Sequence, residues 1–233
     1  MKRLLLLGFL CFPALAWAAS CDVANEYEFI CLAAEKGDDK AQNVLGFMYY
    51  YGDGAKQDYH KSFQWYEKSA KQGNADAQWW LGIMYYHGDG VKQDYHNAFL
   101  WAQKAAEQGN AKAQDLLGFM YYHGQGVKQD YHNAFQWYEK SAKQGNANAQ
   151  SRLGDLYYRG QGIKQDYHKS FQWREKSAKQ GNANAQVSLG AMYFLGTGVR
   201  QNYSLAKEWL GKACDNGNQG GCDSYKEIKQ LGY

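Results

Sequence analysis

The stretch LGFMYYHGQGVKQDYH, residues 117–132, combines an aromatic run, a Gly-x-Gly turn and a histidine, and it decides the fold because it is repeated. Leu-Gly begins at residues 45, 81, 117, 153 and 189, always 36 residues apart. A tryptophan recurs with the same period, at Trp65, Trp101, Trp137, Trp173 and Trp209. A fixed period of this length indicates a repeat architecture. The stretch is therefore one of five structural units and not a unique active site.

Each repeat contains two apolar stripes with helical spacing. In the first half of the central unit, apolar residues recur at i, i+4, i+7 and i+8, at Ala113, Leu117, Met120 and Tyr121. The second half, residues 130–144, has a similar stripe at Tyr131, Ala134, Trp137, Tyr138 and Ala142. Residues at these spacings share one face of an α-helix, so we expect one helix in each half of the repeat.

Capping and turn residues indicate where these helices start and stop. Asp130 can accept a hydrogen bond from the first backbone amides of the second helix, and Asn146 can do the same for the next helix. Gly145 can supply the left-handed residue that ends a helix, and Gly124 and Gly126 permit the turn between the two helices. One helix pair cannot bury both its faces, whereas stacked pairs share a continuous core. The sequence therefore predicts an all-α solenoid of five helix-turn-helix units with terminal caps.

The repeat is similar to that of a known family. The central unit contains Ala111-Lys112-Ala113-Gln114, Leu117-Gly118, Tyr121, Gly124-Gln125-Gly126-Val127, Asp130-Tyr131, Ala134 and Trp137. This pattern resembles the Sel-one-like repeat (SLR) family, which is related to the tetratricopeptide repeats, and the resemblance covers residues 31–222. It implies a right-handed α-solenoid whose first helices line the concave face.

The two ends of the chain differ from the repeats. Met1–Ala18 begins with basic residues, continues as an apolar run and ends small-x-small, which is typical of a secretory signal peptide. An exported chain would be periplasmic or secreted. Ala18-Ala19-Ser20-Cys21 also has the form of a poor lipoprotein acceptor site, so an envelope lipoprotein with a lipid anchor at Cys21 is the alternative. The predicted division is a signal peptide at 1–18, an N-terminal capping helix at 19–40, repeats at 41–76, 77–112, 113–148, 149–184 and 185–220, and a C-terminal capping helix at 221–233.

Charge and hydropathy restrict the partners. The formal net charge is only +3, which is too small for a protein that neutralises nucleic-acid phosphates. After residue 18 no apolar run is long enough to span a bilayer. We therefore expect no nucleic-acid partner and no transmembrane segment, and we expect the chain to be a monomer.

Four cysteines follow the predicted signal peptide: Cys21, Cys31, Cys214 and Cys222. An even number in an exported chain suggests two disulfides. Five stacked repeats would hold the two ends of the solenoid ~40–50 Å apart, whereas a disulfide needs Cα atoms within ~7 Å. The expected pairs are Cys21–Cys31 and Cys214–Cys222, and the first requires Cys21 to fold back before the helix starts. The second pair also resembles the Cys-x7-Cys spacing of exported, cysteine-rich SLR proteins that are described as β-lactamase-like.

Several residues belong to types that can bind metal, act in serine catalysis or bind phosphate, but their positions in the repeat indicate structural roles. His60, His96, His132 and His168 share one repeat position, so the solenoid would space them ~10 Å apart, too far for a common metal ion. Ser204 and Lys207 match Ser-x-x-Lys, but the companion motifs of serine β-lactamases are absent. The Gly-x-Gly turns lack the ending of a phosphate-binding loop. We predict no catalytic residue, no metal site and no cofactor.

The first helices carry a stripe of residues that vary from repeat to repeat, starting one position after the recurring Gln. Exposed aromatic and mixed polar side chains at such positions suit a peptide-binding groove. We predict that the chain binds a protein or peptide partner there; a β-lactam-binding or β-lactam-hydrolysing envelope protein and a lipid-tethered spacer are the alternatives. One position of the stripe, which we call the Tyr50 series, is occupied by Tyr50, Tyr86, Tyr122, Tyr158 and Phe194. For this series, groove lining and packing between helices are equally expected. The predicted groove residues are Asn43, Phe47, Tyr51, Trp79, Ile83, His87, Asp115, Phe119, His123, Ser151, Asp155 and Arg159.

Overall fold

The computed structural model describes residues 21–232, so the predicted signal peptide lies outside the described residues. Within that range the regular secondary structure is helical, apart from an isolated bridge between Val23 and Ala55. The elements are the 3-10 helix η1 (Asn25–Tyr27) and the α-helices α1 (Glu28–Glu35), α2 (Asp39–Tyr51), α3 (Tyr59–Lys71), α4 (Ala75–His87), α5 (Tyr95–Glu107), α6 (Ala111–His123), α7 (Tyr131–Lys143), α8 (Ala147–Arg159), α9 (Tyr167–Lys179), α10 (Ala183–Leu195), α11 (Tyr203–Asp215) and α12 (Gln219–Gln230).

The predicted caps hold the helix ends. The Asp130 carboxylate accepts a hydrogen bond from the backbone amide of Asn133 at 2.9 Å, and the Asn146 side chain accepts one from Ala149 at 3.0 Å. Gly145, just after α7, has a φ of +94°. The start and end of each helix therefore follow from local sequence chemistry.

The core is a row of equivalent residues, one set per repeat. The leucine of each Leu-Gly pair is fully buried, at Leu45, Leu81, Leu117, Leu153 and Leu189. The glycine beside it lets the two helices of a repeat approach, because a Cβ on Gly118 would lie 2.6 Å from the Tyr138 ring. The buried Gln114 donates a hydrogen bond to the Ala106 carbonyl at 3.1 Å and accepts one from Gln144 at 2.8 Å. This glutamine links its helix to the second helices on both sides.

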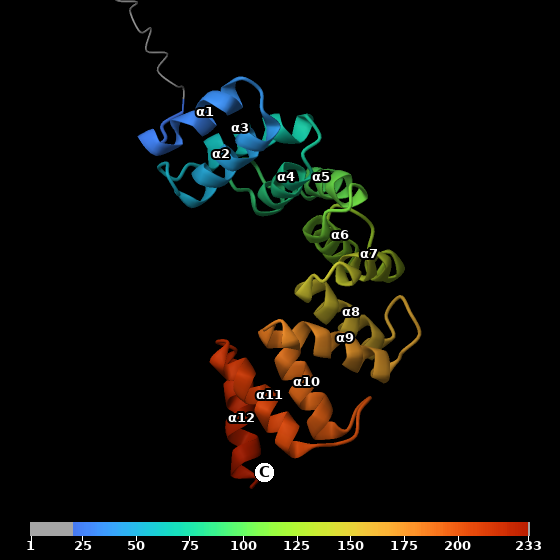
Figure 1. Cartoon of the computed structure of the whole chain (residues 1–233). Coiled ribbons are helices and arrows are strands. Elements are labelled where there is room, and N and C mark those ends of the chain that lie inside the picture. The colour runs from blue at the N-terminus through green and yellow to red at the C-terminus, as the bar shows by residue number, and fades with distance from the viewer. Residues whose placement is uncertain (1–20, 233) are drawn as a thin grey trace, which may run out of the picture.

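The helix pairs stack into an all-α solenoid that bends into an arc (Figure 1). Every pair of α-helices in extensive contact lies one or two positions apart along the chain. Figure 1 shows α4 and α6 on the inner side of the arc and α5 and α7 on its outer side. In these two repeats the first helix therefore lies on the concave side of the arc. No helix within residues 21–232 combines the length and the apolarity needed to cross a bilayer.

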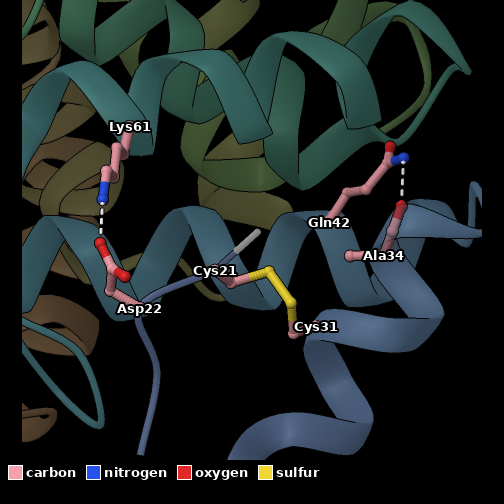
Figure 2. Close-up of a disulfide and its surroundings, with 6 residues drawn as sticks. All are labelled: Cys21, Asp22, Cys31, Ala34, Gln42 and Lys61. Atoms are coloured by element: carbon pink, nitrogen blue, oxygen red, sulfur yellow. Dashed lines mark hydrogen bonds and ion pairs between the residues drawn. A yellow bond between two sulfur atoms is a disulfide. The ribbon is translucent and has the colours of Figure 1, made fainter. Parts of the chain in front are cut away.

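A disulfide closes each end of the stack, with the predicted pairing. Cys214 in α11 and Cys222 in α12 have Cα atoms 4.4 Å apart, and those of Cys21 and Cys31 are 6.0 Å apart. Figure 2 shows the chain returning past α1 so that Cys21 reaches Cys31, as the sequence required. The return is also held by an ion pair of 2.7 Å between Asp22 and Lys61 of α3.

Candidate functional site

The predicted groove residues lie on the first helices α2, α4, α6 and α8, but their exposure is not uniform. Phe47 and Tyr51 of α2 are 42% and 54% exposed, and their rings are in contact with centroids 4.6 Å apart. Trp79 and Ile83 of α4 are half-buried. Asp115 of α6 and Ser151 of α8 are each only 9% exposed, so they contribute little accessible surface.

A hollow of about 600 Å³ runs across α4, α6 and α8. Five of the predicted residues line this hollow: Trp79, Ile83, His87, Asp115 and Phe119. Additional lining comes from Tyr86, Lys112, Leu116, Asn146, Asn148 and Arg152.

A smaller hollow of about 190 Å³ continues the first one toward the C-terminal repeats. Phe119 and Arg152 line both hollows, so the two form one groove. The smaller hollow contains four predicted residues, Phe119, His123, Asp155 and Arg159, together with Tyr122, Tyr138 and Arg152. Asn43, Phe47, Tyr51 and Ser151 line neither hollow.

Arg152 is the groove residue that the sequence prediction missed. Arg152 directly follows Ser151, the first residue of the predicted stripe on α8. The other repeats have Val44, Trp80, Leu116 and Ser188 at this position. Its guanidinium pairs with the Asp115 carboxylate and lies 5.2 Å from the centre of the Phe119 ring. Burial raises the pKa of Asp115 above its ordinary value, and Arg152 only partly offsets this effect. Burial and the neighbouring Arg152 charge both lower the pKa of His123, which favours the neutral imidazole at neutral pH.

Asp155 belongs to a second ion pair. Its carboxylate accepts a hydrogen bond from Arg174 of α9 at 2.7 Å. Arg174 is 7% exposed, and its guanidinium lies 4.7 Å from the centre of the Tyr158 ring. The equivalent positions in repeat 3 carry Phe119 and Tyr138, so repeat 4 has an ion pair where repeat 3 has two aromatic side chains.

The Tyr50 series makes contacts between repeats. Tyr50 donates a hydrogen bond to Asp89 at 2.8 Å, and Asp89 lies in the turn of the next repeat. Tyr86 and Tyr122 make the same bond to Gln125 and Gln161, at 2.9 and 3.0 Å. The packing interpretation therefore accounts for these hydroxyls, although the side chains of Tyr86 and Tyr122 also line the groove.

The recurring histidines have a similar structural use. The His132 Nδ1 atom is 3.3 Å from the Gly162 carbonyl oxygen of the next repeat, and His60 and His168 make equivalent contacts. Within the part of the chain that the structure describes, the one group of three potential metal ligands close enough to share an ion is Cys21, Cys31 and Glu35. Its two sulfur atoms are joined in the disulfide.

Ser204 and Lys207 lie near the start of α11, an ordinary second helix of the repeat, as the repeat alignment predicted. They line a shallow depression together with Glu208, Cys214 and Tyr225. This depression is separate from the groove and shares no residue with it.

Comparison with known families identifies the repeat. The Sel1 repeat model matches five consecutive segments, at residues 39–74, 75–110, 111–146, 147–182 and 183–218. These segments start two residues earlier than the predicted units, so that each begins at the first residue of a first helix. The chain belongs to the Sel1 repeat family, whose members are scaffold proteins that commonly mediate protein interactions.

Solved structures of the same family are similar to this chain. A protective antigen of uropathogenic Escherichia coli with an SLR fold is 38% identical, with a TM-score of 0.81 over 88% of this chain and 44% of its own. This chain therefore spans less than half of that protein. A Sel1 repeat protein of Oxalobacter formigenes is 33% identical, with a TM-score of 0.79 over 84% of this chain and 78% of its own. No curated protein matched the sequence.

Proposed function

We propose that this chain is an exported scaffold that binds an extended segment of a partner protein in its concave groove. The observation that carries the proposal is the continuous groove across α4, α6 and α8, which is lined by aromatic side chains beside charged ones. Aromatic side chains bury a large area at low entropic cost, and they dominate the energetics of many protein interfaces.

The differences between repeats support a polypeptide partner. The buried leucine and glutamine are the same in all five repeats. The groove position at Phe47 is instead occupied by Ile83, Phe119, Asp155 and Ala191 in the later repeats. A uniform polymer would be matched by a uniform row of contacts, whereas a varied row suits a ligand whose side chains also vary. The groove therefore fits a protein segment better than a repeating polymer.

The two disulfides support the proposals that the chain is exported and that it is a monomer. Two disulfides, Cys21–Cys31 and Cys214–Cys222, suit an oxidising compartment such as the periplasm or the extracellular space. Each bond closes one end of the stack, where a repeat has no neighbour on one side. Capped ends favour a monomer over end-to-end association.

Alanine substitutions in the groove test this function. The triple variant Trp79→Ala, Phe119→Ala and Arg159→Ala removes three groove side chains from three different first helices. Wild-type and variant chains would be used to capture proteins from an envelope extract, with quantification by mass spectrometry. We expect a partner that is enriched on the wild-type chain and lost on the variant, with unchanged helical content by circular dichroism.

A matched control uses the outer helices. Leu100, Gln136 and Gln172 are exposed at equivalent positions of α5, α7 and α9. Alanine at all three should leave capture unchanged. If the groove variant retained the partner and the outer variant lost it, the binding surface would be the convex side.

A further inference from the structure

Most charges of the groove are concentrated in one place. The N-terminal end of the groove, around Trp79 and Ile83, is aromatic and aliphatic except for Lys112, whose ammonium group lies 4.8 Å from the centre of the Trp79 ring. On the first helix that follows the groove, α10, a separate hollow is lined by Val187, Ala191 and Leu195, and Leu195 is 64% exposed. Between these two regions, α6 and α8 place the charged hollow lined by Arg152, Asp155 and Arg159.

Two of the three arginines around this hollow are already neutralised. Arg152 pairs with Asp115, and Arg174 pairs with Asp155. Arg159 is exposed at the last residue of α8, and no carboxylate of residues 21–232 lies within ion-pairing distance of it. The cluster of these five side chains therefore has a formal charge of +1, located on Arg159 at the rim. His123 does not change this sum, because its lowered pKa favours the neutral form at neutral pH.

We propose that the partner segment places the carboxylate of an internal Asp or Glu side chain against Arg159, with apolar residues on both sides of that acid. This inference rests on the proposed function and specifies the chemistry of its ligand. An internal acid fits better than a chain end, because apolar side chains lie on first helices on both sides of the charged hollow, on α4 and on α10.

The geometry also gives the spacing of the anchors. Neighbouring first helices of a stack lie ~10 Å apart, and an extended chain covers that distance in about three residues. Apolar side chains about three positions before and after the acid would then reach Phe119 on α6 and the apolar side chains around Leu195 on α10, and a side chain about six positions away would reach Trp79 on α4. The Arg152 side chain lines the same hollow but is already paired with Asp115, so Arg159 is the charge that remains for the incoming carboxylate.

Selection from random peptides tests this motif. The probe is a phage-displayed library of linear peptides of about 12 residues, which span ~40 Å when extended. The bait is the full chain with both disulfides formed. We expect the enriched peptides to contain Asp or Glu flanked by aromatic or aliphatic residues about three positions away. Enriched peptides without an acid would overturn the inference.

Paired measurements assign the acid to Arg159. Affinities are measured for one enriched peptide and for the same peptide with its acid replaced by the amide. We expect the wild-type chain to prefer the acid about tenfold, as for a charged hydrogen bond in a partly dry site. Arg159→Gln should bind both peptides equally. Arg200→Gln, at an exposed residue in the turn after α10, should keep the tenfold preference.

The outcomes separate this inference from the proposed function. If Arg159→Gln kept the full preference for the acid, the carboxylate would bind elsewhere and the inference would be wrong. If peptides without an acid bound the wild-type chain and were lost on Trp79→Ala, the groove function would stand and only the acidic anchor would fail. If no peptide were enriched, both would fail.

Discussion

The second glycine of each Gly-x-Gly turn is a contact between repeats as well as a turn residue. A Cβ on Gly162 would lie 2.1 Å from the backbone oxygen of Tyr131, and its φ is +72°. Gly181 has a φ of +89°, but a Cβ there would meet no atom within 4 Å. We expect Gly162→Ala to lower the free energy of unfolding by about 3 kcal/mol or more, from backbone strain and the clash together.

Gly181→Ala is the matched control, because it adds the strain without the clash. We expect it to cost about 1–2 kcal/mol. Urea denaturation followed by circular dichroism measures both variants. Equal losses would show that the turn conformation alone, and not the contact with the preceding repeat, requires the second glycine.

The Asp155–Arg174 pair gives a second prediction for individual residues. Asp155→Ala would leave the Arg174 guanidinium buried without its partner. Because the Asp155 side chain is 45% exposed, the expected loss is reduced to about 2 kcal/mol of unfolding free energy. The double variant Asp155→Phe with Arg174→Tyr restores the residues of repeat 3, and it should unfold within about 1 kcal/mol of the wild type. An equally destabilised double variant would contradict this account.

These residues show what the sequence could and could not predict. Leu117 and Met120 were predicted to be in the core because both positions carry an apolar residue in every repeat. Arg152 and Arg174 were missed because their partners are 37 and 19 residues away, which no helical spacing reveals. The available signal was that each arginine replaces a residue that is neutral at that position in the other repeats. Paired departures from a repeat, one acidic and one basic, therefore indicate an ion pair.

At the C-terminal end of the stack, α12 is joined to α11 by the Cys214–Cys222 disulfide. It packs against α11, and Gly221 approaches so closely that a Cβ would lie 2.7 Å from that of Ala213. Replacing Cys214 and Cys222 by Ala removes a crosslink across 8 residues, worth about 2 kcal/mol. We expect hydrogen exchange to show faster exchange in α11 and α12 and unchanged exchange in α4–α8.

The Cys21→Ala, Cys31→Ala variant is the counterpart at the other end. Its faster exchange should be confined to α1 and the segment around Val23. Loss of protection across the middle repeats in either variant would mean that a terminal crosslink stabilises the whole chain.

The same elements show which features follow from local sequence and which depend on contacts with distant residues. Helix ends such as Asp130 and Asn146 follow from side chains that bond their own backbone, so sequence alone predicted them. The return of Cys21 toward Cys31 was predicted from the cysteine pairing, but its details were not. Asp22 pairs with Lys61 and Val23 pairs with Ala55, and these partners come from elements more than 30 residues away.

At the scale of the whole molecule, the stack should unfold as a linear array. Extensive contacts join only helices that are near neighbours in the chain, so each repeat is stabilised by the repeats next to it. The fully buried leucines of the five repeats allow one substitution to be compared at equivalent sites. Each Leu→Ala change removes about 3 kcal/mol of local stability. Its effect should depend on the position of the repeat in the stack.

Leu45→Ala, in the first repeat, should open that end alone, because unfolding there breaks only one interface between repeats. Amide protection should fall in α1–α3 while the rest of the chain keeps its urea midpoint. Leu117→Ala, in the central repeat, should lower protection in all repeats together, because opening the middle breaks two interfaces. Hydrogen exchange and urea denaturation of both variants measure this difference. Identical losses in every helix from both substitutions would mean that the chain unfolds as one globular unit, and the description of the groove as a surface built repeat by repeat would then be wrong.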